Sequence, residues 1–331
     1  MEFKYEAPAS PFETNLRRAV GRTAFGFGVL FVVYIVSSLV IDVAVTLLFP
    51  QWLEQDWYTL LMSVLPLYGI AFPLFYVIIR DVPASAPPQH RLAPQHFALF
   101  LPMSIGLMIG GSMITNAVVS VLSRFFPYMD TTDPVSEALM GEELIITAIL
   151  AGIVAPIMEE LICRKLILDR IRPLGEGISI ILSGFLFGAL HGNLHQFFYA
   201  ALLGMLLAFV YLKTGKIVYP MLLHMLVNII CGVLPTIFSN RLMPFMEEEE
   251  FILNSTSVLA IWDMLNFVMA EYALAIIGAV LLYFYFREMK FHIAPSPFEK
   301  KKQFQIAFLN VGIAIVLVAF LGLSSLYLFV E

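Results

Sequence analysis

Charged side chains are scarce in this chain of 331 residues. Asp, Glu, Lys and Arg together make up 13% of it, whereas hydrophobic residues make up 60%. Soluble domains carry charged residues at about 25% of their positions, because their surfaces face water. The composition therefore excludes an ordinary soluble protein and indicates a protein that lives in lipid.

Cysteine and concentrated positive charge are also missing. Cys163 and Cys231 are the only two cysteines and both lie in apolar runs, so a disulfide framework is not expected. The 19 basic residues are spread along the chain and the net charge is −6, which leaves no basic surface for nucleic acid. The first apolar run follows Arg17, Arg18 and Arg22 and lacks a signal cleavage site, so we expect it to remain as an anchor.

Nine apolar stretches are long enough, or nearly so, to cross a membrane. A helix needs about 20 mainly apolar residues to span about 30 Å of hydrocarbon. The stretches cover residues 23–49, 57–79, 96–123, 143–168, 177–192, 195–213, 217–238, 266–286 and 304–329. The fifth is short and meets the sixth at Gly192 and Asn193, so these two form either a hairpin or one broken span. We therefore predict an all-α, polytopic transmembrane helix bundle of eight or nine spans.

The distribution of lysine and arginine orients these spans, because short cytoplasmic loops collect basic residues. If the N-terminus is cytoplasmic and nine spans alternate, every Lys and Arg except Arg124 and Arg241 falls on the cytoplasmic side. The bias predicts a multi-pass protein of a cell membrane with a cytoplasmic N-terminus. A bacterial cytoplasmic membrane is favoured over the endoplasmic reticulum, because the chain is compact and carries no obvious retention signal.

Three connecting segments have distinct patterns. The proline-rich segment 81–95 predicts an extended inner connector, and the acidic segment 127–143 predicts an outer one. The stretch 243–264 contains the run Glu247–Glu250 and is otherwise largely apolar, so we expect it to lie along the outer interface. The glutamate run itself is typical of a solvated face.

Ionisable groups inside the apolar stretches indicate where chemistry is expected, because a charge in the bilayer core costs about 2.5 kcal/mol or more. The fourth stretch contains Glu159, Glu160 and Arg164. Glu160 and Arg164 are four residues apart and share a helix face, whereas Glu159 points about 100° away. One carboxylate can then pair with the arginine while the other stays free to act as a base. The alternative is a structural ion pair near the cytoplasmic interface.

Two further polar clusters follow. His191 ends the fifth stretch and is either a satisfied helix cap or a catalytic group, while His195, beside the loop, is less expected to act. His224 and Asn228 lie on one face of the seventh stretch. Two neutral donors aimed into a bundle suit the stabilisation of an oxyanion. An interhelical hydrogen bond that holds the bundle together is the alternative.

The three clusters together resemble the CAAX-protease and bacteriocin-processing family of intramembrane glutamate endopeptidases. That family is marked by Glu-Glu-x-x-x-Arg, Phe-x-x-x-His and His-x-x-x-Asn, in this order. In this chain the motifs are Glu159, Glu160 and Arg164, then Phe187 and His191, then His224 and Asn228. The match extends from the fourth to the seventh stretch and leaves the first three and the last two unaddressed.

The resemblance implies a membrane-embedded peptidase that needs neither a metal nor a cofactor. Glu159, alone or with His191, would activate a water molecule, His224 and Asn228 would hold the oxyanion, and Arg164 would orient the glutamates. Spacing leaves open which of Glu159 and Glu160 is the base. The partners would be membrane lipid and a membrane-associated peptide or protein, cleaved near its C-terminus or membrane end.

The domain organisation follows from these assignments. Residues 1–331 form a single transmembrane domain, in which 143–238 are the catalytic core helices and 23–123 and 266–329 are flanking helices. On this arrangement Glu159 lies about 13 Å from the inner end of the fourth span, and His191 about 20 Å from that of the fifth. We therefore expect the fifth span to be tilted, or to begin within the membrane with a bend near Gly184 or Gly188. A distance above about 10 Å between His191 and Glu159, with no cavity between them, would reject hydrolysis.

Three rival functions fit parts of the pattern. A zinc protease could use His191, His195 and a glutamate, although the His-Glu-x-x-His helix is absent. A membrane scaffold or immunity protein could keep the polar cluster as interhelical glue without any chemistry. A proton-coupled transporter would also bury carboxylates and histidines, but internal repeats are lacking.

Overall fold

The computed structural model describes residues 10–53, 55–126, 128, 144–246, 254–288 and 296–329, and within these ranges all regular structure is helical. In chain order the α-helices are α1 (Pro11–Leu48), α2 (Asp56–Val64), α3 (Phe72–Ile79), α4 (Pro94–Phe125), α6 (Leu144–Ile149), α7 (Ala155–Glu160), α8 (Asp169–Ile171), α9 (Glu176–Leu190), α10 (Leu194–Thr214), α11 (Val218–Asn228), α12 (Leu234–Met246), α13 (Ser255–Glu288), α14 (Lys300–Phe308) and α15 (Val311–Phe329). The π-helical segments are η2 (Leu65–Ala71), η3 (Leu150–Val154), η4 (Leu161–Leu168) and η6 (Ile229–Val233), and the 3-10 turns are η1 (Pro50–Trp52) and η5 (Arg172–Leu174).

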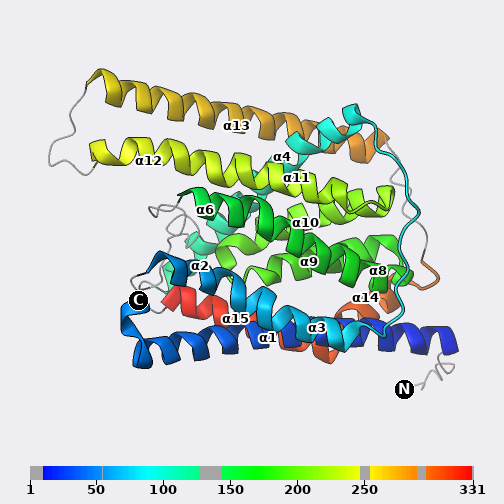
Figure 1. Cartoon of the computed structure of the whole chain (residues 1–331). Coiled ribbons are helices and arrows are strands. Elements are labelled where there is room, and N and C mark those ends of the chain that lie inside the picture. The colour runs from blue at the N-terminus through cyan, green and yellow to red at the C-terminus, as the bar shows by residue number, and fades with distance from the viewer. Residues whose placement is uncertain are drawn as a thin grey trace.

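Most of the long helices lie side by side and run along one common direction, whereas α4 crosses them obliquely (Figure 1). α9 and α10 lie in the middle, α12 and α13 form one edge, and α1 packs beside α15 at the other. The main hydrophobic core joins α1, α9, α10 and α15 through buried side chains such as Phe27, Phe31 and Phe187. The architecture is an all-α, multi-pass bundle, as the sequence predicts.

The number of membrane spans is counted differently in the structure. By length and apolar character, five helices of the described chain could each cross a membrane, or six if α14 and α15, which meet at 61°, form one span. The five are α1, α4, α10, the segment Val218–Phe245 and the segment Ser255–Tyr285. Residues 65–79 and α9 also form apolar helices, but each is too short to be included in this count. The count of eight or nine therefore stays a prediction.

π-helical segments flank the acidic motif on both sides. η3 precedes α7 and η4 follows it, so the fourth predicted span runs from Leu144 to Ile171 as one helical segment. Pro156 lies near the start of α7 and has no N–H, which removes one backbone hydrogen bond and favours the wider turn before it. Such local widenings are frequent at functional sites.

The fifth span is α9, and the helix is unbroken at the glycines where a bend is expected. α9 is a continuous 15-residue helix through Gly184 and Gly188. These glycines allow close packing, because a side-chain carbon on Gly188 would lie 2.6 Å from the carbonyl oxygen of Phe197 in α10. The chain then reverses at Gly192, whose φ of +72° suits glycine.

The fourth segment continues to Ile171, three residues beyond the predicted end, and α9 begins at Glu176 after the turn η5. The relative depth of Glu159 and His191 in the membrane stays a prediction.

The connecting segments gave one confirmation and one error. Residues 83–93 are extended, as predicted, and the connector is tied to the bundle by Ser85 N–H donating to the carbonyl of Asp169 at 2.6 Å. The stretch 243–264 was expected to lie along the interface, but its described parts continue α12 to Met246 and begin α13 at Ser255. The glutamate run 247–250 and the acidic segment 127–143, apart from residue 128, lie outside the described residues.

Candidate active site

Glu160 is held by Arg164 in a fully buried ion pair. The Nε and Nη2 atoms of Arg164 donate to the carboxylate of Glu160 at 2.8 and 3.2 Å, and both side chains are 0% exposed. The Nη1 atom donates to the hydroxyl of Ser183 at 2.7 Å, and the guanidinium lies 5.2 Å from the ring centre of Phe187. A forked pairing of this kind neutralises the carboxylate in place. Glu160 is therefore held in place by the ion pair and has a structural role.

Glu159 has a different environment although it is the next residue. Its side chain is 14% exposed and faces a cavity, and no Lys or Arg of the described chain pairs with it. His224 lies beside it, with Nε2 3.8 Å from the carboxylate of Glu159. The Nδ1 of the same ring lies 3.4 Å from Glu160 without the geometry of a hydrogen bond. His224 thus lies between the two carboxylates.

His191 follows the last residue of α9 and presents one ring nitrogen to the cavity. Its Nδ1 lies 2.9 Å from the carbonyl oxygen of Phe187, and because a carbonyl only accepts, Nδ1 is the donor. In the neutral ring this leaves Nε2 as the acceptor. The ring of Phe187 contacts both histidines, with centroids 5.2 Å from His191 and 5.4 Å from His224. One aromatic side chain therefore fixes both rings.

Asn228 is the last residue of α11 and also faces the cavity. Its amide donates to the carbonyl oxygen of Ala151, in η3, at 2.8 Å. A side-chain amide has two N–H groups, so one remains available to a ligand. His224, one turn earlier, is 2% exposed and does not line the cavity. Of the two residues predicted to hold the oxyanion, only Asn228 therefore lines the cavity, and their joint role stays a prediction.

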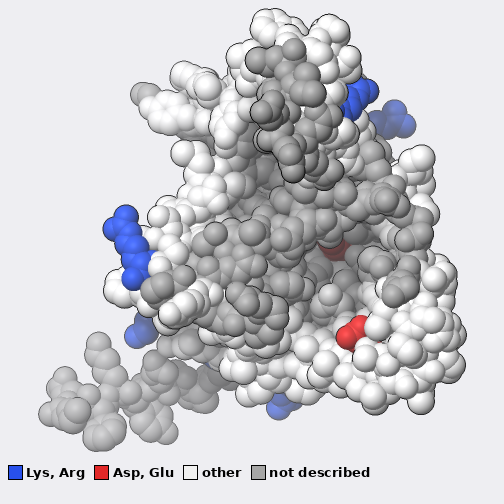
Figure 2. Space-filling view, turned by 90° about the vertical axis from the view of Figure 1, so that its left-hand side faces the viewer, with Lys and Arg blue, Asp and Glu red and all other residues white. Residues whose placement is uncertain are grey.

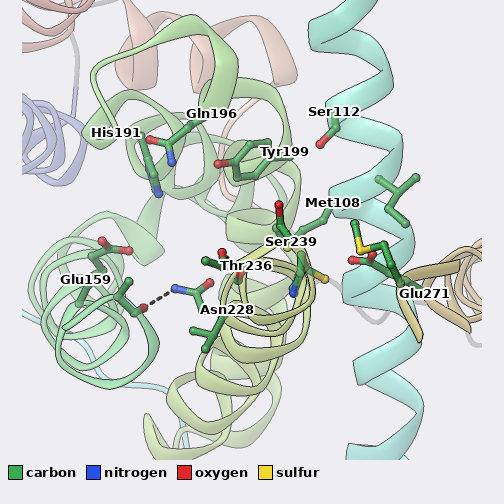
Figure 3. A pocket seen from close by; sticks show the side chains of 18 residues that line it. Met108, Ser112, Glu159, His191, Gln196, Tyr199, Asn228, Thr236, Ser239 and Glu271 are labelled. Carbon is green, nitrogen blue, oxygen red and sulfur yellow. Dashed lines mark hydrogen bonds between the residues drawn. The ribbon is translucent and has the colours of Figure 1, made fainter. Parts of the chain in front are cut away.

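A cavity of about 590 Å³ connects these side chains. Glu159, His191 and Asn228 lie on one side of it, and residues of α4 and α13 lie on the other (Figure 3). The cavity extends along α12 and α13 to Ser239 and Met264, towards the end of the bundle where α12 stops. Figure 2, which views that end, shows a hollow beneath the lobe of α12 and α13 with acidic atoms inside it. The condition that would reject hydrolysis is not met, because Glu159 and His191 share a cavity.

The turn after α9 has a structural role. Asn193 caps α10 by accepting from the N–H of Gln196 at 2.9 Å and donates to the backbone carbonyl of His191 at 3.0 Å. His195 is buried and lies outside the cavity lining, so it does not join His191. Within the described ranges no three His, Cys, Asp or Glu side chains converge as metal ligands.

The structure adds residues that the sequence did not single out. Gln196 and Tyr199 of α10 and Ser112 of α4 line the cavity, and polar residues at these positions have no distinguishing pattern in the sequence. Glu271 of α13 also lines it. The sequence does contain a signal for Glu271, because it is a carboxylate within the apolar stretch 266–286, as Glu159 is within the fourth stretch.

The fold and the site define a class: a multi-pass membrane helix bundle with carboxylates and histidines gathered around an internal cavity. Residues 141–230 match the family described as type II CAAX prenyl endopeptidase Rce1-like. The match confirms the resemblance to the CAAX-protease family over the segment that carries all three motifs, and it supports a membrane protease. Neither among curated proteins nor among solved structures does any protein match this chain.

Proposed function

We propose that this protein is an intramembrane endopeptidase in which Glu159 activates water. The observation that carries the proposal is that Glu159, His191 and Asn228 line one cavity, while Glu160 is neutralised by Arg164. The base is thus assigned to Glu159 and not to Glu160. Hydrolysis of a peptide bond needs a base, a water and a donor for the oxyanion, and this set contains a residue for each requirement.

The reaction follows from these positions. Glu159 takes a proton from water, the hydroxide attacks the scissile carbonyl carbon, and the tetrahedral oxyanion forms. The free N–H of Asn228 donates to that oxyanion, and Nε2 of His191 orients the water. Glu159 then passes its proton to the leaving nitrogen as the C–N bond breaks. His224 acts through Glu159, which it orients from 3.8 Å, and Arg164 keeps Glu160 in place.

The same assignments suggest how the protein sits in the membrane. We propose eight or nine spans with a cytoplasmic N-terminus, because the basic residues then gather on one side. We propose a bacterial cytoplasmic membrane on the separate ground that the chain is compact and carries no obvious retention signal. The catalytic core would be residues 143–238, flanked by 23–123 and 266–329 in one domain. On this topology the cavity extends towards the outer side, so the scissile bond would lie near the membrane end of a substrate.

The experiment is direct. Detergent-purified protein is incubated with prenylated and unprenylated peptides, and cleavage products are identified by mass spectrometry. Wild type should cleave at least one set, and Glu159→Gln and His224→Ala should lose turnover while remaining folded. Equal cleavage by wild type and Glu159→Gln would refute the proposal.

A non-enzymatic scaffold is the competing function, favoured by the buried network of Glu160, Arg164 and Ser183, which binds helices together without any chemistry. Glu159→Gln separates the two functions in cells. A scaffold or immunity protein keeps its phenotype with this substitution, whereas a peptidase loses it.

A further inference from the structure

Glu271 is a second carboxylate in the cavity, and the proposed hydrolysis does not use it. It lies in α13 on the side opposite Glu159 (Figure 3). α13 lies at the edge of the bundle, and most of its apolar residues are exposed. A carboxylate in the interior of such a helix is costly unless it faces polar space. The helix meets that requirement by turning Glu271 into the cavity.

The position of Glu271 is fixed by the packing of α13 on α4. A side-chain carbon on Gly278 would collide with the backbone of Pro102, and one on Gly106 would lie 2.9 Å from the carbonyl oxygen of Ala275. The two helices are therefore in backbone contact one to two turns from Glu271. A group carried by such a rigid pair is held in place for recognition.

In the part of the chain that the structure describes, the cavity offers Glu271 no lysine or arginine as a partner. The thiol of Cys231 is its hydrogen-bond neighbour, and a thiol is too weak a donor to balance a carboxylate. Arg241, on the neighbouring helix α12, is directed to Asp263 instead, at 3.8 Å. A ligand with a cationic group would complete the site.

We propose that Glu271 determines substrate specificity by binding a lysine or arginine side chain of the peptide whose scissile bond lies at Glu159. This inference rests on the proposed peptidase function. A cationic side chain that enters the partly buried cavity exchanges water for a charged hydrogen bond, which is shorter and stronger than a neutral one. Removal of the carboxylate leaves that cation unpaired, so the penalty falls on cationic substrates alone.

The test uses peptides that differ in one side chain. Wild type is first given a library of randomised decapeptides, and the cleavage sites are read by mass spectrometry. A matched pair is then made with lysine or its uncharged isostere norleucine at the selected position. For wild type, kcat/KM should be about 10-fold or more higher for the lysine peptide. In Glu271→Gln this ratio should fall to near one, through loss on the lysine peptide only, and Glu271→Lys should favour an acidic residue there.

Asp263→Asn is the control, because Asp263 is a carboxylate of the same helix that does not line the cavity. It should keep the wild-type preference. Cleavage without a preference for cations, or a preference that survives in Glu271→Gln, overturns the inference while the peptidase function stands. If wild type cleaves nothing, no position is selected, so labelled decapeptides with lysine or norleucine at each position in turn are made, and their binding to Glu159→Gln is measured by fluorescence anisotropy. Equal binding of the lysine and norleucine peptides at every position, or none, then overturns the inference as well.

Discussion

Arg164 and Glu160 are joined by two hydrogen bonds in a region that water does not reach. The pair settles the charge of one of two adjacent carboxylates and leaves the other facing the cavity. Because neighbouring residues of a helix point about 100° apart, a single dipeptide can supply both a structural anion and a reactive one. The first two predictions test this division of roles.

Glu159→Gln should abolish turnover and leave the fold intact. The amide has almost the same shape but cannot accept the proton of water, so the rate should fall by about 10²–10⁴-fold. Cleavage of a peptide substrate and thermal unfolding of the same detergent-purified sample measure the two properties. A variant that retains more than a tenth of wild-type turnover would refute the role of Glu159.

Arg164→Met should unfold the protein more readily, because Glu160 is left as an unpaired buried charge. Breaking a buried pair costs about 3–5 kcal/mol, whereas replacing both partners by apolar residues is often close to neutral. The double variant with Glu160→Met should therefore be more stable than Arg164→Met alone. Denaturant titration of the wild type, both single variants and the double variant gives the coupling energy, and additive losses would contradict the ion-pair assignment.

His191 and His195 should differ sharply when each is replaced by alanine. His191→Ala removes the nitrogen that faces the cavity and should lower kcat by about 10²-fold or more. His195→Ala should change kcat by less than about threefold, because its ring lies outside the cavity lining. A zinc mechanism predicts instead that both variants are inactive. It also predicts that a chelator stops cleavage by wild type until zinc is restored.

The fold was largely predictable because the bilayer constrains it. Lipid forces backbone groups into helices, so apolar length alone gave the positions of the helical segments. The extent of α13 was missed because it begins at Ser255, and its first turns were assigned to an interfacial stretch. The bend in α9 stays a prediction, and what the structure shows is that Gly184 and Gly188 pack closely against α10. The sequence shows where a glycine lies, but the helix that packs against it decides whether it allows close packing or bending.

The site was predictable where residues share a helix and much less so where they do not. The i,i+4 spacing gave the pairing of Glu160 with Arg164, which the structure contains. The same spacing placed His224 and Asn228 together, yet only Asn228 lines the cavity, because His224 is buried beside the two glutamates. Glu271 lies 111 residues after Glu160 in the sequence, and only the tertiary packing brings it to the cavity.

Asn228→Ala separates oxyanion stabilisation from interhelical glue. If the free N–H of Asn228 holds the oxyanion, kcat should fall by about 10²–10³-fold with little change in KM. If its bond to Ala151 only ties α11 to η3, the loss is limited to about 0.6–2 kcal/mol of stability, and kcat is kept. Thr236→Ala is the matched control, because this hydroxyl lines the same cavity but is already bonded to the carbonyl of Gly232. Thr236→Ala should therefore keep wild-type kcat, and an equal loss of kcat in both variants would show that the amide has no specific part in the reaction.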